Sequence, residues 1–406
     1  MLNGALPMHV LFIPSWYPAQ SDDIAGSFFR EQALALQGHG MQIGVITPAF
    51  RSLTRWRAIR GGYGFDAEND NGLHTLRYHG VRAFSWSHAM NIRFWERTGL
   101  RAFDDYQRRV GRPDVLHVHA MIFGLAWAAA IHREHGIPFV VTEHSSEFVR
   151  SPVRIPLLNY LTNQVSQAHR AFAVSSSLGK VLDFQVPLRE GRTWEVMPNM
   201  VSSRFGLSTR NPFYQNGRGA PLRLLSVGSM DNNKGVHHLL RAMFLAIGAG
   251  ENCLLRVCGS GPQLAALKAL RFELGLDNRV EFLGHCSREQ VSEEMLNATA
   301  LVVSSSNETF GVVVVEALLS GRPVLSTRCG GPEDIIVEGR DGYLVDKDSP
   351  AALSAGLRRL ASELDHFDPQ DIRQRCIERF SDSAFASRHA QVYSAIMAST
   401  SKPAEA

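Results

Sequence analysis

The stretch from Ser304 to Gly331, SSSNETFGVVVVEALLSGRPVLSTRCGG, constrains the fold more than any other part of the chain. An apolar run ends in serines, a polar loop follows, and Phe310–Gly311 opens a segment that ends at Gly321-Arg-Pro. The valines at 312–315 favour a strand by propensity. A glycine followed by proline is nevertheless a helix stop signal, so we predict strand, loop, helix, short strand and a second glycine turn.

The predicted helix begins directly after the carboxylate of Glu308. The first N–H groups of a helix have no partner within the helix, and its dipole favours negative charge, so this end attracts phosphate. Phe310, Gly311 and Val312 are therefore candidates to donate backbone N–H groups to a phosphate or a sugar. Glu316 lies further along the helix, where it is expected to accept from a pair of sugar hydroxyls.

The motif Glu308-x7-Glu316, followed by Gly321-Arg-Pro-Val and Gly330-Gly-Pro-Glu-Asp, resembles the core signature of the retaining nucleotide-sugar glycosyltransferases of family 4. The resemblance implies an α/β protein with the GT-B fold, in which two doubly wound Rossmann-like domains face a cleft. It implies that the donor sits mainly on the second domain and the acceptor on the first. It also implies that Glu316 holds the ribose hydroxyls and that Glu308 is catalytic and holds sugar hydroxyls.

Length and composition fit this reading. The 406 residues suggest two or three domains, and 45% hydrophobic with 20% charged residues is typical of a soluble globular protein with sizeable cores. A net charge of +3 is too small to indicate nucleic-acid binding. The five cysteines are odd in number and lack Cys-x-x-Cys spacing, which indicates a reducing compartment rather than disulfides or zinc.

Two features predict a cytoplasmic protein. The opening MLNGALPMHVLFIPSWYP has no basic region and carries a proline in its apolar part, so it is not typical of a signal peptide. The longest apolar run, Ala120–Ile131, is too short to span a bilayer. Peripheral contact with the inner face of the plasma membrane is a further expectation.

The chain opens with a βαβ pattern: a strand at His9–Ile13, a helix at Ser27–Gln37 and a strand at Gln42–Thr47. Gly26 precedes the helix, where a glycine lets the backbone approach an anion. The alternative is an ordinary N-cap at Ser27. The pattern W-Y-P…G-x-F-x-x-E-Q also resembles the opening of family-4 transferases of bacterial surface-polysaccharide assembly, which implies that Gly26 faces the donor phosphates.

Residues 51–112 are strongly basic, with twelve arginines, no lysine and six acidic residues. Aromatic residues alternate with the arginines, a composition that suits an anionic membrane surface or a diphosphate-linked acceptor. Arg55, Trp56, Arg57 and Arg60 are the candidates for that contact. The alternative is a solvated, helix-rich insertion whose aromatic residues face inward. Nucleic acid fits poorly because no recognised binding motif accompanies the charge.

Three histidines follow two predicted strands, Val115–His119 and Phe139–Thr142. His117 and His119 point to one face, and with His144 they form a candidate zinc site. The alternative is that they form hydrogen bonds at the strand ends. By resemblance, His144 matches a histidine near the donor sugar and is assigned a catalytic part.

The segment from Met197 to Phe205, MPNMVSSRF, resembles the family's P-N-G-V-D…F hinge turn, with Met200 and Ser202 in place of Gly and Asp. Residues 206–221 are rich in Gly, Pro, Asn and Ser, which is typical of a linker. The predicted organisation is a first domain over 1–200, a linker over 201–221, a second domain over 222–380, and a C-terminal helix and tail over 381–406 that cross back to the first domain.

The second domain opens with a strand at Leu222–Val227 and a loop that ends at Lys234-Gly235, before a helix. A lysine at this turn suits neutralisation of a leaving diphosphate, so Lys234 is predicted to bind the donor and to assist catalysis. The alternative is a solvated loop lysine. The turn resembles the family's V-G-R-L-x-x-x-K-G, with Ser229 where the arginine stands. Ser229 therefore belongs to the predicted donor site but leaves the diphosphate with one side-chain cation fewer.

Three further motifs complete the second domain. Gly259-x-Gly261 is interpreted as a tight turn that admits the nucleotide, and by resemblance Val280–Gly284 lies beside the base. Asp346-Lys-Asp348 is interpreted as a helix N-cap or solvated turn rather than a metal–diphosphate motif. We therefore expect no metal and no cofactor, with the nucleotide-sugar as a co-substrate.

These features together predict a retaining glycosyltransferase that moves a hexose from a UDP- or GDP-linked sugar to a glycan or lipid-linked oligosaccharide in surface-polysaccharide synthesis. Two alternatives stay open. A glycoside hydrolase would use Glu308 and Glu316 as acid and nucleophile. A non-catalytic nucleotide-sugar-binding protein would keep the same cleft, and the departure at Ser229 is compatible with it.

Overall fold

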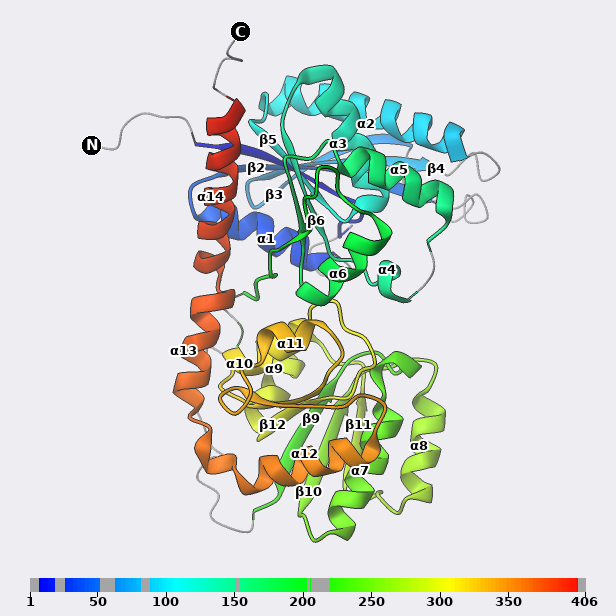
Figure 1. Cartoon of the computed structure of the whole chain (residues 1–406), viewed down its shortest axis with the longest axis vertical. Coiled ribbons are helices and arrows are strands. Elements are labelled where there is room, and N and C mark those ends of the chain that lie inside the picture. The colour runs from blue at the N-terminus through cyan, green and yellow to red at the C-terminus, as the bar shows by residue number, and fades with distance from the viewer. Residues whose placement is uncertain are drawn as a thin grey trace, which may run out of the picture. The chain divides into compact units, whose positions relative to one another are not determined.

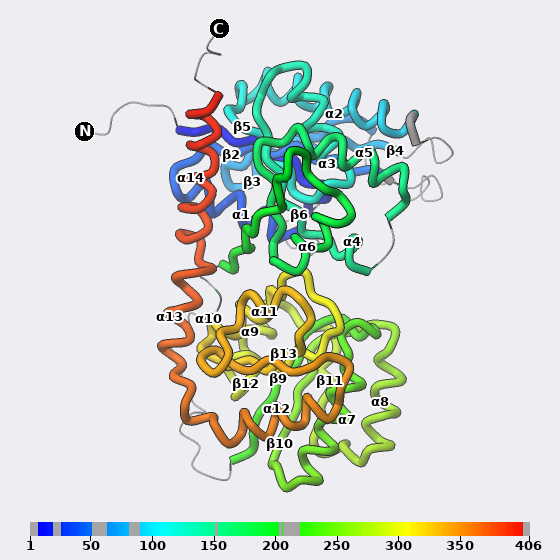
Figure 2. Tube along the Cα trace, viewed as in Figure 1, coloured from blue at the N-terminus to red at the C-terminus, as the bar shows by residue number. Residues whose placement is uncertain are grey.

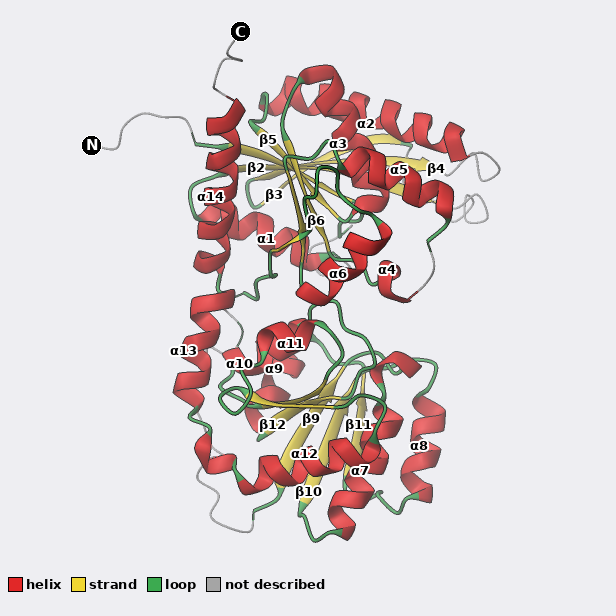
Figure 3. Cartoon of the chain, viewed as in Figure 1, coloured by secondary structure: helices red, strands yellow, loops and turns green. Residues whose placement is uncertain are grey.

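The structure is a computed structural model that describes residues 7–18, 26–51, 63–81, 88–150, 153–202, 205 and 220–400 (Figure 1). The chain divides into two compact units, the first formed by Met1–Met200 with Asp382–Ala406 and the second by Val201–Ser381. Each unit is built on its own largely parallel sheet with helices packed on it (Figure 3). The predicted α/β class with two Rossmann-like domains is therefore confirmed.

Within the described residues, the sheet of the first unit has the order β3-β4-β2-β1-β5-β6-β7-β8. All neighbouring strands are parallel except β3 and β4. The strands are β1 (His9–Pro14), β2 (Gln42–Arg51), β3 (Gly64–Asp70), β4 (Leu73–Val81), β5 (Val115–His119), β6 (Phe139–Glu143), β7 (Arg170–Ala173) and β8 (Glu195–Val196).

The helices of the first unit include the last helix of the chain. They are α1 (Ser27–Gly38), α2 (His88–Val110), α3 (Met121–His135), α4 (Glu147–Arg150), α5 (Ile155–Val165), α6 (Ser176–Gln185) and α14 (Asp382–Thr400). Helix α14 lies beside α1, as the cartoon in Figure 1 and the Cα tube in Figure 2 both show. Helix α14 ends at Thr400, the last residue that the structure describes. No helix in the described segments combines the length and apolarity that crossing a membrane requires.

The described part of the basic segment 51–112 holds the long helix α2 and, in addition, two strands that the sequence analysis did not predict. Strands β3 and β4 form an antiparallel hairpin, and β4 continues the sheet by pairing with β2. The turn between them is Asn71-Gly72, with φ of 54° and 89°. A two-residue Asn-Gly turn with positive φ at both positions is the strongest short hairpin signal, because its twist matches that of the strands. Of the aromatic residues, Trp95 and Phe103 are buried and Phe65 is exposed.

Within the described residues, the sheet of the second unit is parallel throughout, in the order β11-β10-β9-β12-β13-β14. Its strands are β9 (Leu222–Val227), β10 (Cys253–Cys258), β11 (Val280–Gly284), β12 (Ala300–Val303), β13 (Val324–Thr327) and β14 (Gly342–Val345). Its helices are α7 (Val236–Gly248), α8 (Leu264–Glu273), α9 (Arg288–Asn297), α10 (Val312–Leu319), α11 (Gly331–Ile335), α12 (Pro350–Ser362) and α13 (Pro369–Phe380), with short 3-10 turns η2 (Asn232–Lys234) and η3 (Leu364–His366).

The helix predicted after Phe310 is confirmed as α10, despite its four valines. Val314, Val315 and Leu318 are buried, and the helix packs against β12 and β13. Burial of these side chains outweighs the small cost of β-branched residues in a helix. The predicted linker 201–221 lies largely outside the described residues.

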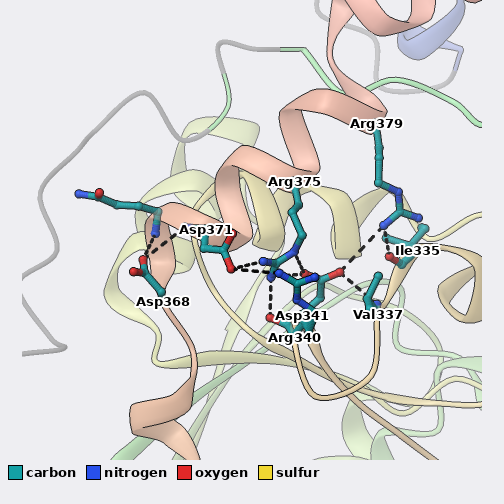
Figure 4. A network of polar contacts seen from close by, with 9 residues as sticks. Ile335, Val337, Arg340, Asp341, Asp368, Asp371, Arg375 and Arg379 are labelled. Carbon is teal, nitrogen blue, oxygen red and sulfur yellow. Dashed lines mark hydrogen bonds and ion pairs between the residues drawn. The ribbon is translucent and has the colours of Figure 1, made fainter.

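A buried carboxylate attaches α13 to the second unit (Figure 4). Arg375 donates to Asp341 Oδ1 at 2.8 and 3.1 Å, and the backbone N–H of Val337 donates to Oδ2 at 3.0 Å. Arg379 donates to the carbonyl of Ile335 at 2.7 Å. The Asp341 side chain is only 2% exposed, so these partners offset the cost of burying its charge.

A histidine cluster attaches α14 to the sheet of the first unit. The Nδ1 atom of His117 lies 2.6 Å from the hydroxyl of Tyr393, and its Nε2 atom lies 2.8 Å from Oγ1 of Thr142. The rings of His119 and His389 stack on that of His117 at centroid distances of 4.0 and 5.5 Å. Burial lowers the pKa of His389 to about 4 and holds the pKa values of His117 and His119 well below their usual range.

These buried imidazoles predict that acid destabilises the first unit. Below about pH 6.5 the unfolded chain binds protons that the folded cluster excludes, so the free energy of unfolding falls by about 1.4 kcal/mol per pH unit for each such histidine. Burial raises the pKa of Glu143 to about 7, so below that pH the folded state binds one proton at this carboxyl that the unfolded chain does not yet bind. This proton partly offsets the loss of stability that the histidines cause. All six tryptophans lie at or before residue 194, so their fluorescence during urea unfolding reports this unit.

A variant isolates one histidine of the cluster. His389→Gln should make the decline between pH 6.5 and 5 shallower by about 1.4 kcal/mol per pH unit. His74→Gln, at an exposed position of the same unit, should leave the slope unchanged. An identical slope in wild type and His389→Gln would show that His389 titrates alike in the folded and unfolded states.

Candidate functional site

The loops that follow β9 and β12 meet at the carboxyl edge of the second unit's sheet, where ligands of open parallel sheets bind. The backbone N–H of Ser306 donates to the carbonyl of Asn233 at 2.8 Å, and the Asn233 amide donates to the carbonyl of Asn307 at 2.9 Å. The Ser304 hydroxyl donates to the carbonyl of Lys234 at 2.8 Å. Residues 228–235 and 304–308 therefore form one rigid assembly.

The Lys234 turn is built by its own side chains. Asp231 Oδ1 accepts from the backbone N–H of Lys234 at 3.1 Å, and the Ser229 hydroxyl donates to Asp231 Oδ2 at 2.7 Å. Gly235 has φ of 60°, and a Cβ there would overlap the carbonyl oxygen of Ser304. The turn thus requires glycine on two grounds. Ser229, predicted to line the donor site, contacts the turn-forming aspartate.

Lys234 and Glu308 form an ion pair at the centre of this assembly. The Lys234 Nζ atom lies 2.6 Å from Glu308 Oε1, and the Ser305 hydroxyl donates to the same oxygen at 2.6 Å. The two side chains are 21% and 14% exposed. Glu308 Oε2 takes no hydrogen bond from the described residues, so this oxygen can accept from a ligand. Lys234 is therefore not a solvated loop lysine, the alternative weighed above.

The N-terminus of α10 opens beside this pair. Gly311, with φ of 97°, occupies the N-cap position, and no side chain within the described residues caps this end. The Phe310 side chain is 4% exposed, and a Cβ on Gly331 would overlap the Phe310 backbone. The N–H groups at the start of α10 are thus held by packing rather than by a capping side chain, an arrangement suited to an anion.

Glu316 lies on the second turn of α10 and is 9% exposed. Its Oε1 atom lies 3.9 Å from an Nη2 atom of Arg288 at the start of α9. Sequence reasoning placed Glu316 here through the motif spacing. Arg288 was missed, because no motif joins it to the site.

In the first unit, Gly26 occupies the N-cap position of α1 with φ of 82°, so the alternative of a Ser27 N-cap is wrong. A Cβ on Gly26 would press on Trp16, Tyr17 and Pro18 at 3.2 Å. The glycine therefore lets this loop pass close to the helix start.

His144 lies in the buried histidine cluster of the same unit. Its Nε2 atom is 3.2 Å from Nδ1 of His119, and burial lowers the pKa of His144 to about 3, so the ring is neutral at physiological pH. The described residues contain no group of three or more His, Cys, Asp or Glu side chains placed to hold a metal ion. His117 and His144 instead form hydrogen bonds at the strand ends, His117 with Thr142 and His144 with His119.

Sequence reasoning missed a buried polar pair in the first unit. The Gln32 amide donates to Asn199 Oδ1 at 2.9 Å. Gln32 and Asn199 are 1% and 6% exposed. Gln32 belongs to the E-Q motif and Asn199 to the P-N motif described above. A buried polar side chain needs a hydrogen-bond partner, so polar residues inside these motifs could have been predicted to pair.

The other predicted residues fall in two groups. Arg55, Trp56, Arg57 and Arg60 lie outside the described residues. Ser349, not an aspartate of Asp346-Lys-Asp348, is the N-cap of α12, and Asp348 accepts from the Ser306 hydroxyl at 2.7 Å. The second unit also has a pocket of about 790 Å³ that lies away from the carboxyl edge of the sheet. Its lining includes Arg223, Arg256 and Glu294.

Comparison with known proteins gives consistent matches in both units. Residues 25–204 match the family described as Glycosyltransferase Family 4, and residues 210–379 match that described as Glycosyl transferases group 1. An uncharacterized glycosyltransferase of Methanocaldococcus jannaschii is 26% identical over 315 residues, which cover 73% of this chain and 77% of that protein.

Two solved structures share the fold. Sucrose-phosphate synthase from Thermosynechococcus elongatus has a TM-score of 0.72 at 19% identity, with 97% of this chain and 100% of that chain covered. Anabaena HepE in complex with UDP has a TM-score of 0.72 at 17% identity, with 96% and 100% covered. These likenesses confirm the predicted GT-B fold. The family matches favour a transferase over the glycoside hydrolase that Glu308 and Glu316 also suggested.

The fit of Gly235 against Ser304 predicts a selective binding defect. Gly235→Ala combines positive φ with overlap of a carbonyl oxygen, so the Lys234 turn must move. The affinity for nucleoside diphosphate, measured by calorimetry, should fall at least about tenfold, which corresponds to about 1.4 kcal/mol.

Gly250→Ala is the matched control. Gly250 also has positive φ, 99°, but a Cβ there meets nothing within 4 Å. It should share the backbone strain and leave the affinity unchanged. Equal affinities in both variants would mean that the Lys234 turn does not hold the ligand.

Proposed function

This chain carries the family 4 and group 1 domains of a glycosyltransferase that uses a nucleotide sugar, and we propose that it is a retaining hexosyltransferase. The donor is a UDP- or GDP-linked hexose, and the acceptor is a glycan or lipid-linked oligosaccharide of a surface polysaccharide. The assignment of a donor-binding site rests on one observation: the Lys234–Glu308 ion pair lies beside the start of α10, which no side chain of the described residues caps.

The proposal assigns each donor group to a described feature of the second unit. The diphosphate lies on Lys234 and on the N–H groups of Phe310, Gly311 and Val312. The ribose hydroxyls bind Glu316, and the transferred sugar offers hydroxyls to Glu308 Oε2. In the first unit, Gly26 and His144 are assigned to the donor by the motifs that contain them, His144 as a neutral imidazole.

The chemistry follows from charge placement. When the bond between the anomeric carbon and the phosphate oxygen breaks, negative charge develops on the leaving diphosphate, which Lys234 and the helix dipole stabilise. The acceptor hydroxyl attacks the same face of the sugar, and its proton passes to the departing phosphate oxygen. Retention of configuration results without a protein nucleophile, and positioning supplies much of the rate. We expect no metal requirement, so activity should survive EDTA.

A nucleotide screen and one variant test this function. Thermal-shift and calorimetric titrations with UDP, GDP and ADP should identify one tight ligand, and its hexose conjugate should give product with retained anomeric configuration by NMR. Glu308→Gln should lower kcat at least about a hundredfold, because the sugar loses a charged acceptor. Nucleotide affinity should persist, because Lys234 remains.

Glu338→Gln serves as the control, since Glu338 is a half-exposed carboxylate paired with Arg328. It should have wild-type turnover. Wild-type turnover in Glu308→Gln would contradict the assignment. Tight nucleotide-sugar binding without turnover in the wild type would instead support the non-catalytic alternative.

The acceptor side is proposed to contact an anionic membrane surface. Arg93, Arg97 and Arg101 are exposed at a spacing of four along α2, and none has an acidic partner within 4 Å among the described residues. Residues at this spacing share one face of a helix. Basic side chains near an anionic bilayer contribute about 1 kcal/mol each.

Co-sedimentation with phosphatidylserine-containing vesicles tests this surface. Replacing Arg93, Arg97 and Arg101 with glutamate should weaken binding at least about a hundredfold, and neutral phosphatidylcholine vesicles should bind neither protein. Equal sedimentation of wild type and variant on anionic vesicles would rule out α2 as the membrane surface.

A further inference from the structure

The carboxylate of Glu308 receives hydrogen bonds from two donors of different kinds. Lys234 Nζ and the hydroxyl of Ser305 both lie 2.6 Å from Oε1 of this carboxylate. The lysine side chain is 21% exposed, whereas Ser305 is only 2% exposed. A hydroxyl has one hydrogen to donate, and an ammonium has three. The serine therefore gives its single hydrogen to Glu308, while the lysine has further donors for a ligand.

Ser305 is held in place through its backbone. The hydroxyl of Thr327 on β13 donates to the carbonyl of Ser305 at 2.5 Å, and Thr327 is fully buried. The preceding residue is tied to the turn after β9, because the Ser304 hydroxyl donates to the carbonyl of Lys234 at 2.8 Å. These bonds fix the Ser305 backbone, so its hydroxyl starts from one defined position.

The backbone of Glu308 is fixed as well. Its N–H donates to the carbonyl of Cys329 at 2.7 Å, and its carbonyl accepts from the N–H of Gly331 at 2.9 Å. The freedom left at this residue is in its side-chain torsions, so the donors on Oε1 determine where Oε2 points. Ordering a glutamate side chain costs conformational entropy, and donors already in place bear this cost during folding rather than during the reaction.

We propose that Ser305 is a positioning residue, which keeps Glu308 directed at the transferred sugar while Lys234 binds the diphosphate. The proposal rests on the function proposed above. An incoming diphosphate competes with Glu308 for the ammonium of Lys234, because both are anions. The Ser305 hydroxyl is neutral and buried, so the diphosphate does not draw it away. Oε1 therefore keeps one donor throughout the reaction, and Oε2 stays directed at a sugar hydroxyl.

Removal of this hydroxyl should slow the reaction without weakening nucleotide binding. Calorimetry gives the affinities for UDP, GDP and ADP, and turnover is measured as release of the tightest of these from its hexose conjugate. Ser305→Ala should lower kcat at least about tenfold, because a hydrogen bond to a charged group is lost. The affinity for the nucleoside diphosphate should stay within about twofold of wild type, because the lost bond acts on the sugar rather than on the nucleotide.

Two further variants separate the hydrogen bond from the space that the serine fills. Ser305→Cys keeps a similar shape but has only a weak donor, so kcat should again fall, at least about threefold. Ser354→Ala removes another buried serine hydroxyl of the second unit, in α12, and should have wild-type turnover.

A double variant tests whether Ser305 acts through Glu308. The losses of kcat in Ser305→Ala and Glu308→Gln should not add when the two changes are combined, because residues in one interaction are coupled.

The role of Ser305 is overturned by any of three results. These are wild-type kcat in either Ser305→Ala or Ser305→Cys, equal loss of kcat and nucleotide affinity in both of these variants, and full additivity with Glu308→Gln. Each of them leaves the proposed function intact as long as the wild type binds one nucleotide tightly and turns over its hexose conjugate. Failure of the wild type to bind UDP, GDP or ADP would instead refute the proposed function.

Discussion

The ion pair between Lys234 and Glu308 is the contact on which the organisation of the second unit's carboxyl edge depends. It joins the turn after β9 to the loop after β12, and Ser305 adds a hydroxyl to the same carboxylate oxygen. The backbone follows the same pairing, because Gly235 packs directly on the carbonyl of Ser304. Charge and packing therefore fix the two loops together before any ligand arrives, which is the preorganisation that electrostatic catalysis requires.

The first unit uses buried polar groups differently. His117, Thr142 and Tyr393 attach the C-terminal helix to the sheet through bonds of 2.6 and 2.8 Å. His144 belongs to the same cluster, with its Nε2 atom 3.2 Å from Nδ1 of His119. One connected set of neutral imidazoles thus both docks α14 and orients the histidine assigned to the donor. A change at α14 can consequently reach His144 through ring contacts alone.

Much of this fold could be predicted from the sequence, and the reasons are local. Parallel strands buried on both faces read as short apolar runs, so β1, β5 and β9 were predicted to within one residue at each end. Helix α10 was identified from its stop signal although its valines favour a strand. The hairpin β3–β4 was not predicted, because the segment was interpreted from its arginine content alone. The dipeptide Asn71-Gly72, which is a hairpin turn signal, was present in the sequence.

The site was predictable only where a motif fixed the spacing. Glu308 and Glu316 belong to one sequence motif, and Lys234 belongs to a second one. The structure brings Lys234 and Glu308 into contact. Gln32 and Asn199 could not be assigned in this way, because their hydrogen bond joins two segments that are far apart in the sequence. Ser229 was recognised as a departure from the motif, but its bond to Asp231 depends on the conformation of the turn.

A crystal structure of the chain with the nucleoside diphosphate that it binds most tightly tests the central claim most directly. The diphosphate should lie within hydrogen-bonding distance of Lys234 Nζ and of the N–H groups at the start of α10, with the ribose on Glu316. Nucleotide bound instead in the pocket lined by Arg223, Arg256 and Glu294 would contradict the assignment of the donor site to the carboxyl edge.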